Sequence, residues 1–310
     1  MQVQTAHEQL LFNTVRIELP GMSSGTGFFV TARGEEIADP SKGGDMVFLV
    51  TNKHVIEGHQ GSIHVHMIRG NEANSGPELG QQVSFDMRVA SPDAWTMHPD
   101  PDVDVAVAPF GQELQIAERA GQRPFLRAIR PDQMLSDQVV EQLDAVEEVT
   151  FIGYPRALYD MVNLTPLVRR GITSTPVALD WGGKPVFLID AAVFPGSSGS
   201  PVYIADRGGW TDRSGNVTLG QSRLYLLGVV GAAYEASMFG ELEEIVEETR
   251  RESGQQGVRI NHSLNLGIVY KAAAIMDCVD IILERNGARR ISPAPAEDQR
   301  QESGDQAQAA

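Results

Sequence analysis

The sequence is short of cysteine and of basic residues, and it has no long apolar run. Cys278 is the only cysteine among 310 residues, which excludes an intramolecular disulfide and indicates a reducing compartment. There are 25 Lys and Arg residues against 41 Asp and Glu residues, a formal net charge of −16 that argues against binding to nucleic acid or to an anionic membrane. No stretch approaches the roughly 20 apolar residues that span a bilayer. Since the first residues also lack a basic start and an apolar signal-peptide run, we expect a cytoplasmic protein.

Short apolar runs, separated by clusters of glycine and proline, predict a fold built from β-strands. The first series of expected strands covers residues 14–19, 27–31, 46–51, 62–67, 83–89 and 103–109. The second series covers residues 148–152, 167–174, 185–192, 199–203, 223–233 and 264–270. Helical patterns are missing between these runs, which favours closed antiparallel sheets or a sandwich over alternating strands and helices.

The two series predict two β halves of similar size, at residues 1–111 and 148–290. Residues 112–147 contain few β-branched residues and are interpreted as a surface linker. An amphipathic pattern at about residues 271–285 predicts a closing helix. The tail from residue 291 to 310 is rich in Pro, Ala, Gln, Glu and Asp, and we expect it to be disordered.

A run of glutamates predicts an acidic helix within the second half. Residues 241–251 contain five glutamates and no glycine or proline, inside an insertion at about residues 236–256. A solvated helical insertion is the preferred interpretation. The alternative is a docking helix for a regulatory protein partner.

Three serines lie close together between glycines and prolines in residues 194–203, namely Ser197, Ser198 and Ser200. A serine that attacks a carbonyl needs a base, a group that orients the base, and backbone donors for the developing oxyanion. The neighbouring glycines allow a tight turn in which the amides of Gly196 and Ser198 would point at one oxygen.

His54 and Asp104 are the candidates for the base and for its orienting carboxylate. A β-rich run delivers His54 to the end of a strand, and an imidazole pKa of about 6.5 suits a group that accepts and returns a proton near neutral pH. Asp104 directly precedes an apolar strand, where burial would protect its carboxylate from solvent. Asp102 is the main rival for this orienting role.

These blocks resemble the chymotrypsin-fold serine peptidases, and among them the bacterial trypsin-like branch that includes the high-temperature-requirement proteases. The resemblance spans about residues 25–282 and keeps the family's order of His, Asp and Ser. Its blocks are Gly25-Thr26-Gly27-Phe28-Phe29-Val30, Thr51-Asn52-Lys53-His54-Val55, Asp104-Val105-Ala106-Val107, Asp190-Ala191-Ala192 and Pro195-Gly196-Ser197-Ser198-Gly199-Ser200-Pro201, with a weaker match at residues 266–270.

The resemblance implies an all-β fold of two antiparallel six-stranded β-barrels with a C-terminal α-helix. It also implies that Ser198 is the nucleophile of a serine endopeptidase, with His54 and Asp104 completing the triad, and that Ser200 packs beside it. Ser197 stands where secreted digestive relatives hold an aspartate that pairs with a newly cut amino terminus. Activity would therefore be constitutive or controlled by a partner.

The resemblance further implies a substrate pocket whose walls carry no charge, formed by Ala192, Val193, Gly231, Ala232 and Gly267. We therefore expect a protein or peptide substrate with a small or medium apolar residue at the cleavage position, and no cofactor. No PDZ-type peptide-binding module follows the second half, which favours one specific regulatory substrate over misfolded chains at large. The alternative is a catalytically silent or partner-gated scaffold that acts as a protein-binding adaptor.

Other polar clusters are interpreted without a metal. Asp100, Asp102 and Asp104 are spaced like the start of a calcium loop, but the central glycine and terminal glutamate of such a loop are missing. His64 and His66 share one face of an expected strand, with His59 nearby, and a solvated strand face is the preferred interpretation. Cys278 lies within the closing helix and is expected to be a small core residue.

Overall fold

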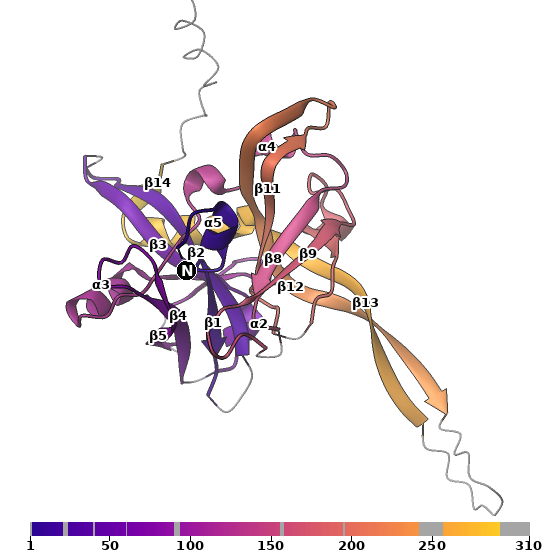
Figure 1. The fold of residues 1–310 in the computed structure, drawn as a ribbon, viewed down its shortest axis with the longest axis horizontal. Helices are drawn as coiled ribbons and strands as arrows, with labels where there is room; N and C mark the ends of the chain where they lie inside the picture. The colour runs from indigo at the N-terminus through magenta and orange to yellow at the C-terminus, as the bar shows by residue number, and fades with distance from the viewer. Residues whose placement is uncertain are drawn as a thin grey trace, which may run out of the picture.

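The computed structural model describes residues 2–20, 24–39, 41–59, 61–89, 94–155, 158–194, 196–241 and 257–291. Strands dominate these residues and form two antiparallel sheets, one from each half of the chain (Figure 1). The two sheets and the C-terminal helix confirm the expected fold class.

The first sheet contains eight strands, where six were expected. Their order is β5-β4-β1-β2-β3-β7-β6, and β14 pairs with β2. The bounds are β1 (Thr14–Glu18), β2 (Ser24–Glu36), β3 (Gly43–Thr51), β4 (Ser62–Gly70), β5 (Pro77–Arg88), β6 (Thr96–Met97), β7 (Ala106–Pro109) and β14 (Ala288–Arg290). The two additional strands are short: β6 has two residues, and β14 returns from the far end of the chain.

The second sheet closes into a barrel of six strands in the order β10-β13-β12-β11-β8-β9. The bounds are β8 (Glu148–Gly153), β9 (Leu167–Thr173), β10 (Val186–Asp190), β11 (Pro201–Thr211), β12 (Val217–Glu241) and β13 (Gly257–Lys271). Beyond the barrel, β12 and β13 continue outward as a two-stranded ribbon (Figure 1).

Five α-helices accompany the sheets within the described residues: α1 (Ala6–Leu10), α2 (Lys53–Ile56), α3 (Gly111–Arg119), α4 (Asp137–Val140) and α5 (Ala272–Arg285). The predicted closing helix corresponds to α5 and agrees with it to within one residue at its start. The expected surface linker instead contains α3, the 3-10 turn η1 (Pro131–Gln133) and α4. Phe125 and Ile129 of this segment are almost completely buried, because they pack against the first sheet.

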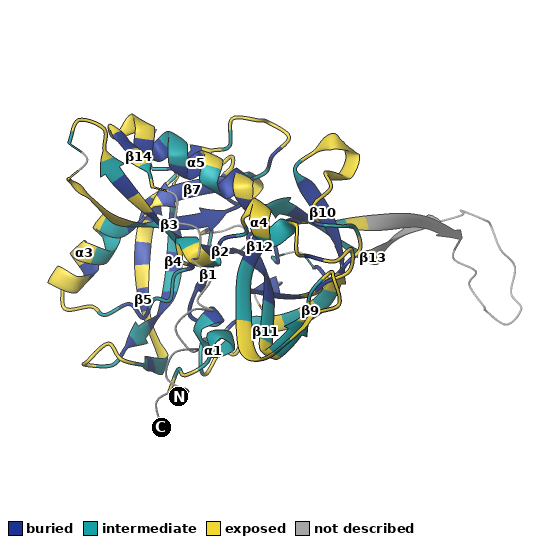
Figure 2. Ribbon diagram, turned by 90° about the horizontal axis from the view of Figure 1, so that it is seen from above, coloured by how far each residue is buried: buried dark blue, intermediate teal, exposed yellow. Residues whose placement is uncertain are grey.

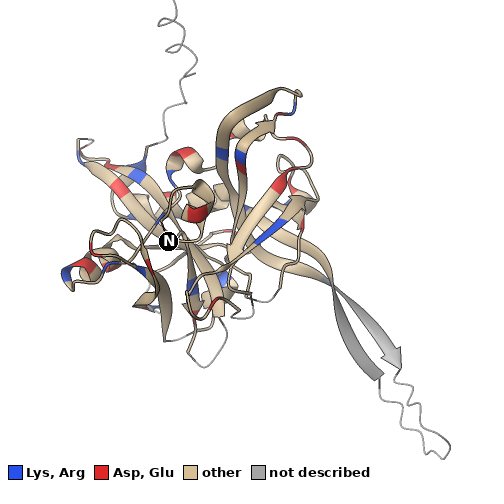
Figure 3. Cartoon of the chain, viewed as in Figure 1, with Lys and Arg blue, Asp and Glu red and all other residues tan. Residues whose placement is uncertain are grey.

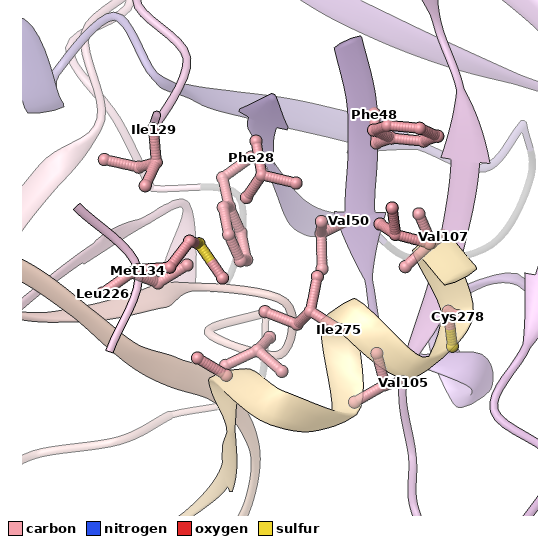
Figure 4. Close-up of a cluster of buried hydrophobic side chains, with 14 of the residues drawn as sticks. Phe28, Phe48, Val50, Val105, Val107, Ile129, Met134, Leu226, Ile275 and Cys278 are labelled. Carbon is pink, nitrogen blue, oxygen red and sulfur yellow. The ribbon is translucent and has the colours of Figure 1, made fainter. Parts of the chain in front are cut away.

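The main core lies where the two halves meet and is closed by α5. Phe28 and Val50 from the first sheet, Leu226 from the second and Ile275 from α5 belong to one buried cluster (Figure 4). In the ribbon coloured by burial, buried residues concentrate between the sheets, and exposed residues lie along α3 and on the outer loops (Figure 2). The two halves therefore share apolar surface in addition to a covalent connection.

The predicted insertion and the predicted tail of the second half lie largely outside the described residues. Residues 236–241, expected in a helical insertion, lie in β12 and pair with residues 257–262 of β13, because the strand pattern continues beyond the barrel. The remainder of the insertion, including most of the acidic run at 241–251, lies outside the described residues, as does the tail from residue 292. Within the described part, acidic and basic residues are interspersed over both halves (Figure 3).

Candidate active site

His54 lies on α2, immediately after β3. Asn52, in an extended conformation, ends the strand segment and occupies the N-cap position of this helix of four residues, without a capping hydrogen bond from its side chain. Val55 and Ile56 are buried beneath the helix, so the His54 side chain points outward and is 48% exposed. Gly25 permits this packing, since a Cβ atom there would lie 2.6 Å from Val55 Cγ1. The short helix therefore fixes the histidine at the surface between the two halves.

Strand register brings Asp104 to His54. Thr51 at the end of β3 pairs with Ala106 at the start of β7 in an antiparallel ladder. The residues after Thr51 therefore face those before Ala106. Asp104 Oδ2 lies 2.5 Å from His54 Nδ1, and Asp104 Oδ1 accepts a hydrogen bond of 3.1 Å from the His54 amide. One carboxylate thus holds the histidine through both its ring and its backbone.

Asp104 is itself held in place, whereas its rival Asp102 is engaged elsewhere. The buried Asn52 donates from Nδ2 to the Asp104 carbonyl oxygen at 2.6 Å. The neighbouring Val103 and Val105 side chains are buried and anchor the segment on both sides. Asp102 points away and pairs with Lys184 at 3.1 Å. The geometry therefore supports Asp104, not Asp102, as the partner of His54.

Ser198 lies in a tight turn formed by Gly196 and Gly199, which have φ angles of +87° and +84°. L side chains rarely adopt these angles, and a Cβ atom at Gly199 would also lie 1.8 Å from the Thr26 carbonyl oxygen. The Ser198 hydroxyl donates to the Gly231 carbonyl oxygen at 3.2 Å. Gly231 lies beside Asn52, since a Cβ atom there would be 3.6 Å from Asn52 Nδ2. Ser198 therefore lies near the residues that hold Asp104.

The amides of Gly196 and Ser198, which were expected to bind an oxyanion, both belong to this turn. Its other N–H groups are paired: Ser197 donates to Phe194 at 2.9 Å, Gly199 to Val230 at 2.9 Å and Ser200 to Ser197 at 3.0 Å. Among the described residues, the amides of Gly196 and Ser198 have no hydrogen-bond acceptor. The side chains of Ser197 and Ser200 are buried, which leaves Ser198 as the accessible serine of the turn.

Thr26 connects the first half to this turn, a role that sequence reasoning missed. Its amide donates to the Ser198 carbonyl at 3.0 Å, and its hydroxyl donates to the Gly196 carbonyl at 3.0 Å. The same hydroxyl accepts from the Tyr154 amide at 3.0 Å. The signal available in the sequence was the pair of glycines around Thr26, because glycine within a strand often marks the close approach of another backbone.

The residues expected to form a substrate pocket fall into two groups. Ala192 and Ala232 are exposed, whereas Val193, Gly231 and Gly267 are buried. Val193 packs into the core of the closed barrel, where a Cβ atom on Gly267 would lie 2.7 Å from its Cγ2 atom.

Arg169 on β9 supports the segment between the pocket residues and the serine turn. Its guanidinium donates to the Ala192 carbonyl oxygen, and it stacks 4.7 Å from the centre of the Phe194 ring. Partial burial lowers the pKa of Arg169.

The remaining polar candidates lie away from this site. His64 bonds to Asp86, and His66 contacts Glu18 at 3.1 Å, carboxylates that only cross-strand pairing brings close. No group of three metal-ligating side chains converges within the part of the chain that the structure describes. Cys278 is fully buried, and burial raises the pKa of its thiol to about 12, as expected of a core residue. Among the described helices, none has the length and hydrophobicity of a membrane-spanning segment.

Comparison with solved structures finds matches at low identity. An inactivated protease paralogue of the scabies mite is 13% identical, over 91% of this chain and 98% of that chain, with a TM-score of 0.42. A thermostable serine protease from an extremophilic microorganism is 10% identical, over 86% of this chain and 95% of that chain, with a TM-score of 0.43. A search of curated proteins gave no match.

A family model gives the decisive comparison. The model of the trypsin-like peptidase domain matches residues 25–209, which include His54, Asp104 and Ser198. The match covers more than half of the chain and extends over parts of both sheets. The chain therefore belongs to the trypsin-like peptidase family.

Proposed function

We propose that this protein is a serine endopeptidase that cleaves peptide bonds through His54, Asp104 and Ser198. The observation that carries the proposal is the two-point contact between the Asp104 carboxylate and His54, at 2.5 Å and 3.1 Å. This contact fixes the ring with Nδ1 toward the carboxylate and leaves Nε2 for proton transfer. The accessible serine and two unpaired amides in the adjoining turn supply the other parts of an acyl-transfer site.

The proposed reaction begins when the Ser198 hydroxyl leaves the Gly231 carbonyl and donates its proton to His54 Nε2. The serine oxygen attacks the peptide carbonyl, and the amides of Gly196 and Ser198 bind the negative oxygen of the tetrahedral intermediate. His54 returns the proton to the departing amine, and an acyl-enzyme remains. Water, deprotonated by His54, then releases the acyl group and restores the free serine.

A small or medium apolar residue is proposed at the cleavage position. The exposed candidates Ala192 and Ala232 are methyl side chains, and the buried Gly231 and Gly267 add no charge. An apolar wall of this kind stabilises an apolar side chain but provides no partner for the charge of Lys or Arg.

The experiment is digestion of an unfolded protein mixture, followed by mass spectrometry of the newly formed peptide ends. We expect wild-type protein to cut after apolar residues and Ser198→Ala to lose at least about 10³-fold in kcat/KM. Ser214→Ala removes an exposed hydroxyl from the turn between β11 and β12 and should retain full activity. Equal cleavage by wild type and Ser198→Ala would show that another protein in the preparation is responsible.

A second candidate function, a partner-gated scaffold, is favoured by one observation. The Ser198 hydroxyl donates to the Gly231 carbonyl instead of to His54. A resting serine of this kind would need a partner or a substrate to turn it toward the base. If the protein is a partner-gated scaffold, the isolated protein should cleave no peptide even though His54 and Asp104 remain paired. If it is an endopeptidase, the isolated protein should cleave peptides without an added partner.

A further inference from the structure

Two aromatic side chains are joined at the surface of the second half. Trp181 belongs to the 3-10 turn η3 (Trp181–Gly183) and is 46% exposed, and Tyr234 on β12 is 39% exposed. The indole N–H of Trp181 donates to the Tyr234 hydroxyl oxygen at 3.3 Å. Exposed aromatic rings held together in this way offer a rigid apolar surface, against which another apolar side chain can be buried.

Ion pairs tie the turn that carries Trp181 at both ends. Asp180, directly before the turn, pairs with Lys271 at the end of β13 at 2.6 Å. Lys184, directly after the turn, pairs with Asp102 at 3.1 Å. The turn is therefore held between β13 and the loop that carries the aspartate of the proposed triad. The charges that flank the turn are already paired, so the ring stands between neutralised groups.

Strand β12 leads from the proposed nucleophile to this aromatic pair. The Gly231 carbonyl on β12 accepts the Ser198 hydroxyl at 3.2 Å. Tyr234 follows three residues later on the same strand, and a strand rises about 3.3 Å per residue, so the two positions lie at most about 10 Å apart along β12. Ala232, between them, is exposed. A peptide can therefore lie along this segment and contact both the serine and the aromatic pair.

We propose that Trp181 and Tyr234 determine substrate specificity by binding an apolar or aromatic side chain about three residues before the cleavage position. This inference rests on the proposed function. An acyl group attached to Ser198 begins beside Gly231, and an extended peptide has the same rise per residue as β12, so its residue three positions earlier reaches Tyr234. Because Asp180 and Lys184 are engaged in ion pairs, they give a charged substrate side chain no free partner next to Trp181.

The kinetic test uses the substrates acetyl-X-Ala-Ala-Ala-p-nitroanilide, in which X is Phe, Ala, Arg or Glu. We expect kcat/KM of wild-type protein to be at least about tenfold higher for Phe than for Ala, because the ring of X is buried against the aromatic pair. In Trp181→Ala the ratio between these two substrates should fall below about twofold. A ratio in Trp181→Ala equal to that of the wild type, or a wild-type preference for Arg or Glu over Phe, would overturn the inference.

Two further variants separate recognition from a general loss of packing. Trp181→Phe keeps an aromatic ring but loses the N–H that bonds to Tyr234, and it should retain most of the preference for Phe. Leu219→Ala is the matched control: Leu219 is a large apolar residue on the same strand, 78% exposed, near the other end of β12. Its loss should leave the ratio between the Phe and Ala substrates unchanged. An equal loss of preference in Leu219→Ala and Trp181→Ala would contradict the assignment.

Binding can be measured without any activity, by NMR of the indole N–H signals in Ser198→Ala. The chain has three tryptophans, and the signal of Trp181 is identified by its absence from Trp181→Phe. Addition of acetyl-Phe-Ala-Ala-Ala-amide should shift the Trp181 signal and leave those of Trp95 and Trp210 in place. The corresponding peptide with Ala in place of Phe should bind at least about tenfold more weakly. An unmoved Trp181 signal at saturating Phe peptide would overturn the inference.

The two proposals fail in different ways. If wild-type protein hydrolyses none of the four anilides but the Phe peptide still shifts the Trp181 signal, the proposed function is wrong and the aromatic pair remains a peptide-binding site. If the anilides with Phe and Ala are cleaved with equal efficiency and the Trp181 signal does not move, the aromatic pair has no role in recognition and the proposed function stands.

Discussion

A threonine hydroxyl from the first half supports the serine turn of the second half. The Thr26 hydroxyl donates to the Gly196 carbonyl, so it restrains the Gly196–Ser197 peptide, which lies between the two amides that would bind the oxyanion. Thr26→Val should therefore lower kcat by about tenfold, whereas Thr26→Ser should retain most of it. Steady-state kinetics of the two variants provide the measurement. Equal activity of the valine and serine variants would show that the hydroxyl has no role.

Gly199 is constrained by its φ angle and by the space around it. Gly199→Ala combines a left-handed φ of +84° with a Cβ atom 1.8 Å from the Thr26 carbonyl, and we expect a loss of at least about 3 kcal/mol in the free energy of unfolding. Gly215→Ala is the control: its φ is also +84°, but no atom lies within 4 Å, so strain alone should cost about 1 kcal/mol. Urea unfolding measures both, and equal losses would refute the steric account.

The paired strands β1 and β4 predict a pH-dependent contribution to stability. Burial, followed by the charge of Arg16, lowers the pKa of His66 from 6.5, although Glu18 opposes this shift. As the pH falls below about 6.5, the unfolded chain binds a proton that the folded chain does not, so the free energy of unfolding decreases until the folded pKa is reached.

The measurement is urea unfolding between pH 7.5 and 5.5 in wild type and in His66→Asn, whose side chain does not titrate. The pH dependence should be weaker in the variant by the contribution of His66. A curve for His66→Asn that runs parallel to the wild-type curve would contradict this assignment.

Strand positions could be predicted because their pattern is local. In β4, for example, Ile63, Val65 and Met67 are buried and alternate with less buried histidines, which the sequence displays directly. The outward continuation of β12 was missed because glutamate-rich sequence favours a helix, whereas pairing with β13 determines the conformation of residues 236–241. β14 was missed because its partner β2 lies far away in the sequence.

The candidate site was predictable only in part, for the same physical reason. His54, Asp104 and Ser198 stand in compact motifs whose residue types suggest their chemistry. Their supporting contacts join residues that are distant in sequence, as from Thr26 to Gly196 and from Asn52 to Asp104.

At the scale of the whole molecule, the shared core predicts cooperative unfolding. One buried cluster contains Phe28 from the first sheet, Leu226 from the second and Ile275 from α5, so neither half can open without exposing the other. Trp95 lies in the first half and Trp210 in the second. Variants in which either Trp95 or Trp210 is the only one of the three tryptophans that remains should report the same urea midpoint by fluorescence. Two separate midpoints would show that the halves unfold independently.

The central claim is that Ser198 is a nucleophile activated by His54. The most direct measurement is reaction of the isolated protein with a fluorophosphonate, followed by tandem mass spectrometry to locate the adduct. The account predicts one adduct, on Ser198, which is absent in Ser198→Ala, much slower to form in His54→Ala and retained in Ser200→Ala. An adduct on another serine, or labelling that persists in folded Ser198→Ala, would contradict it.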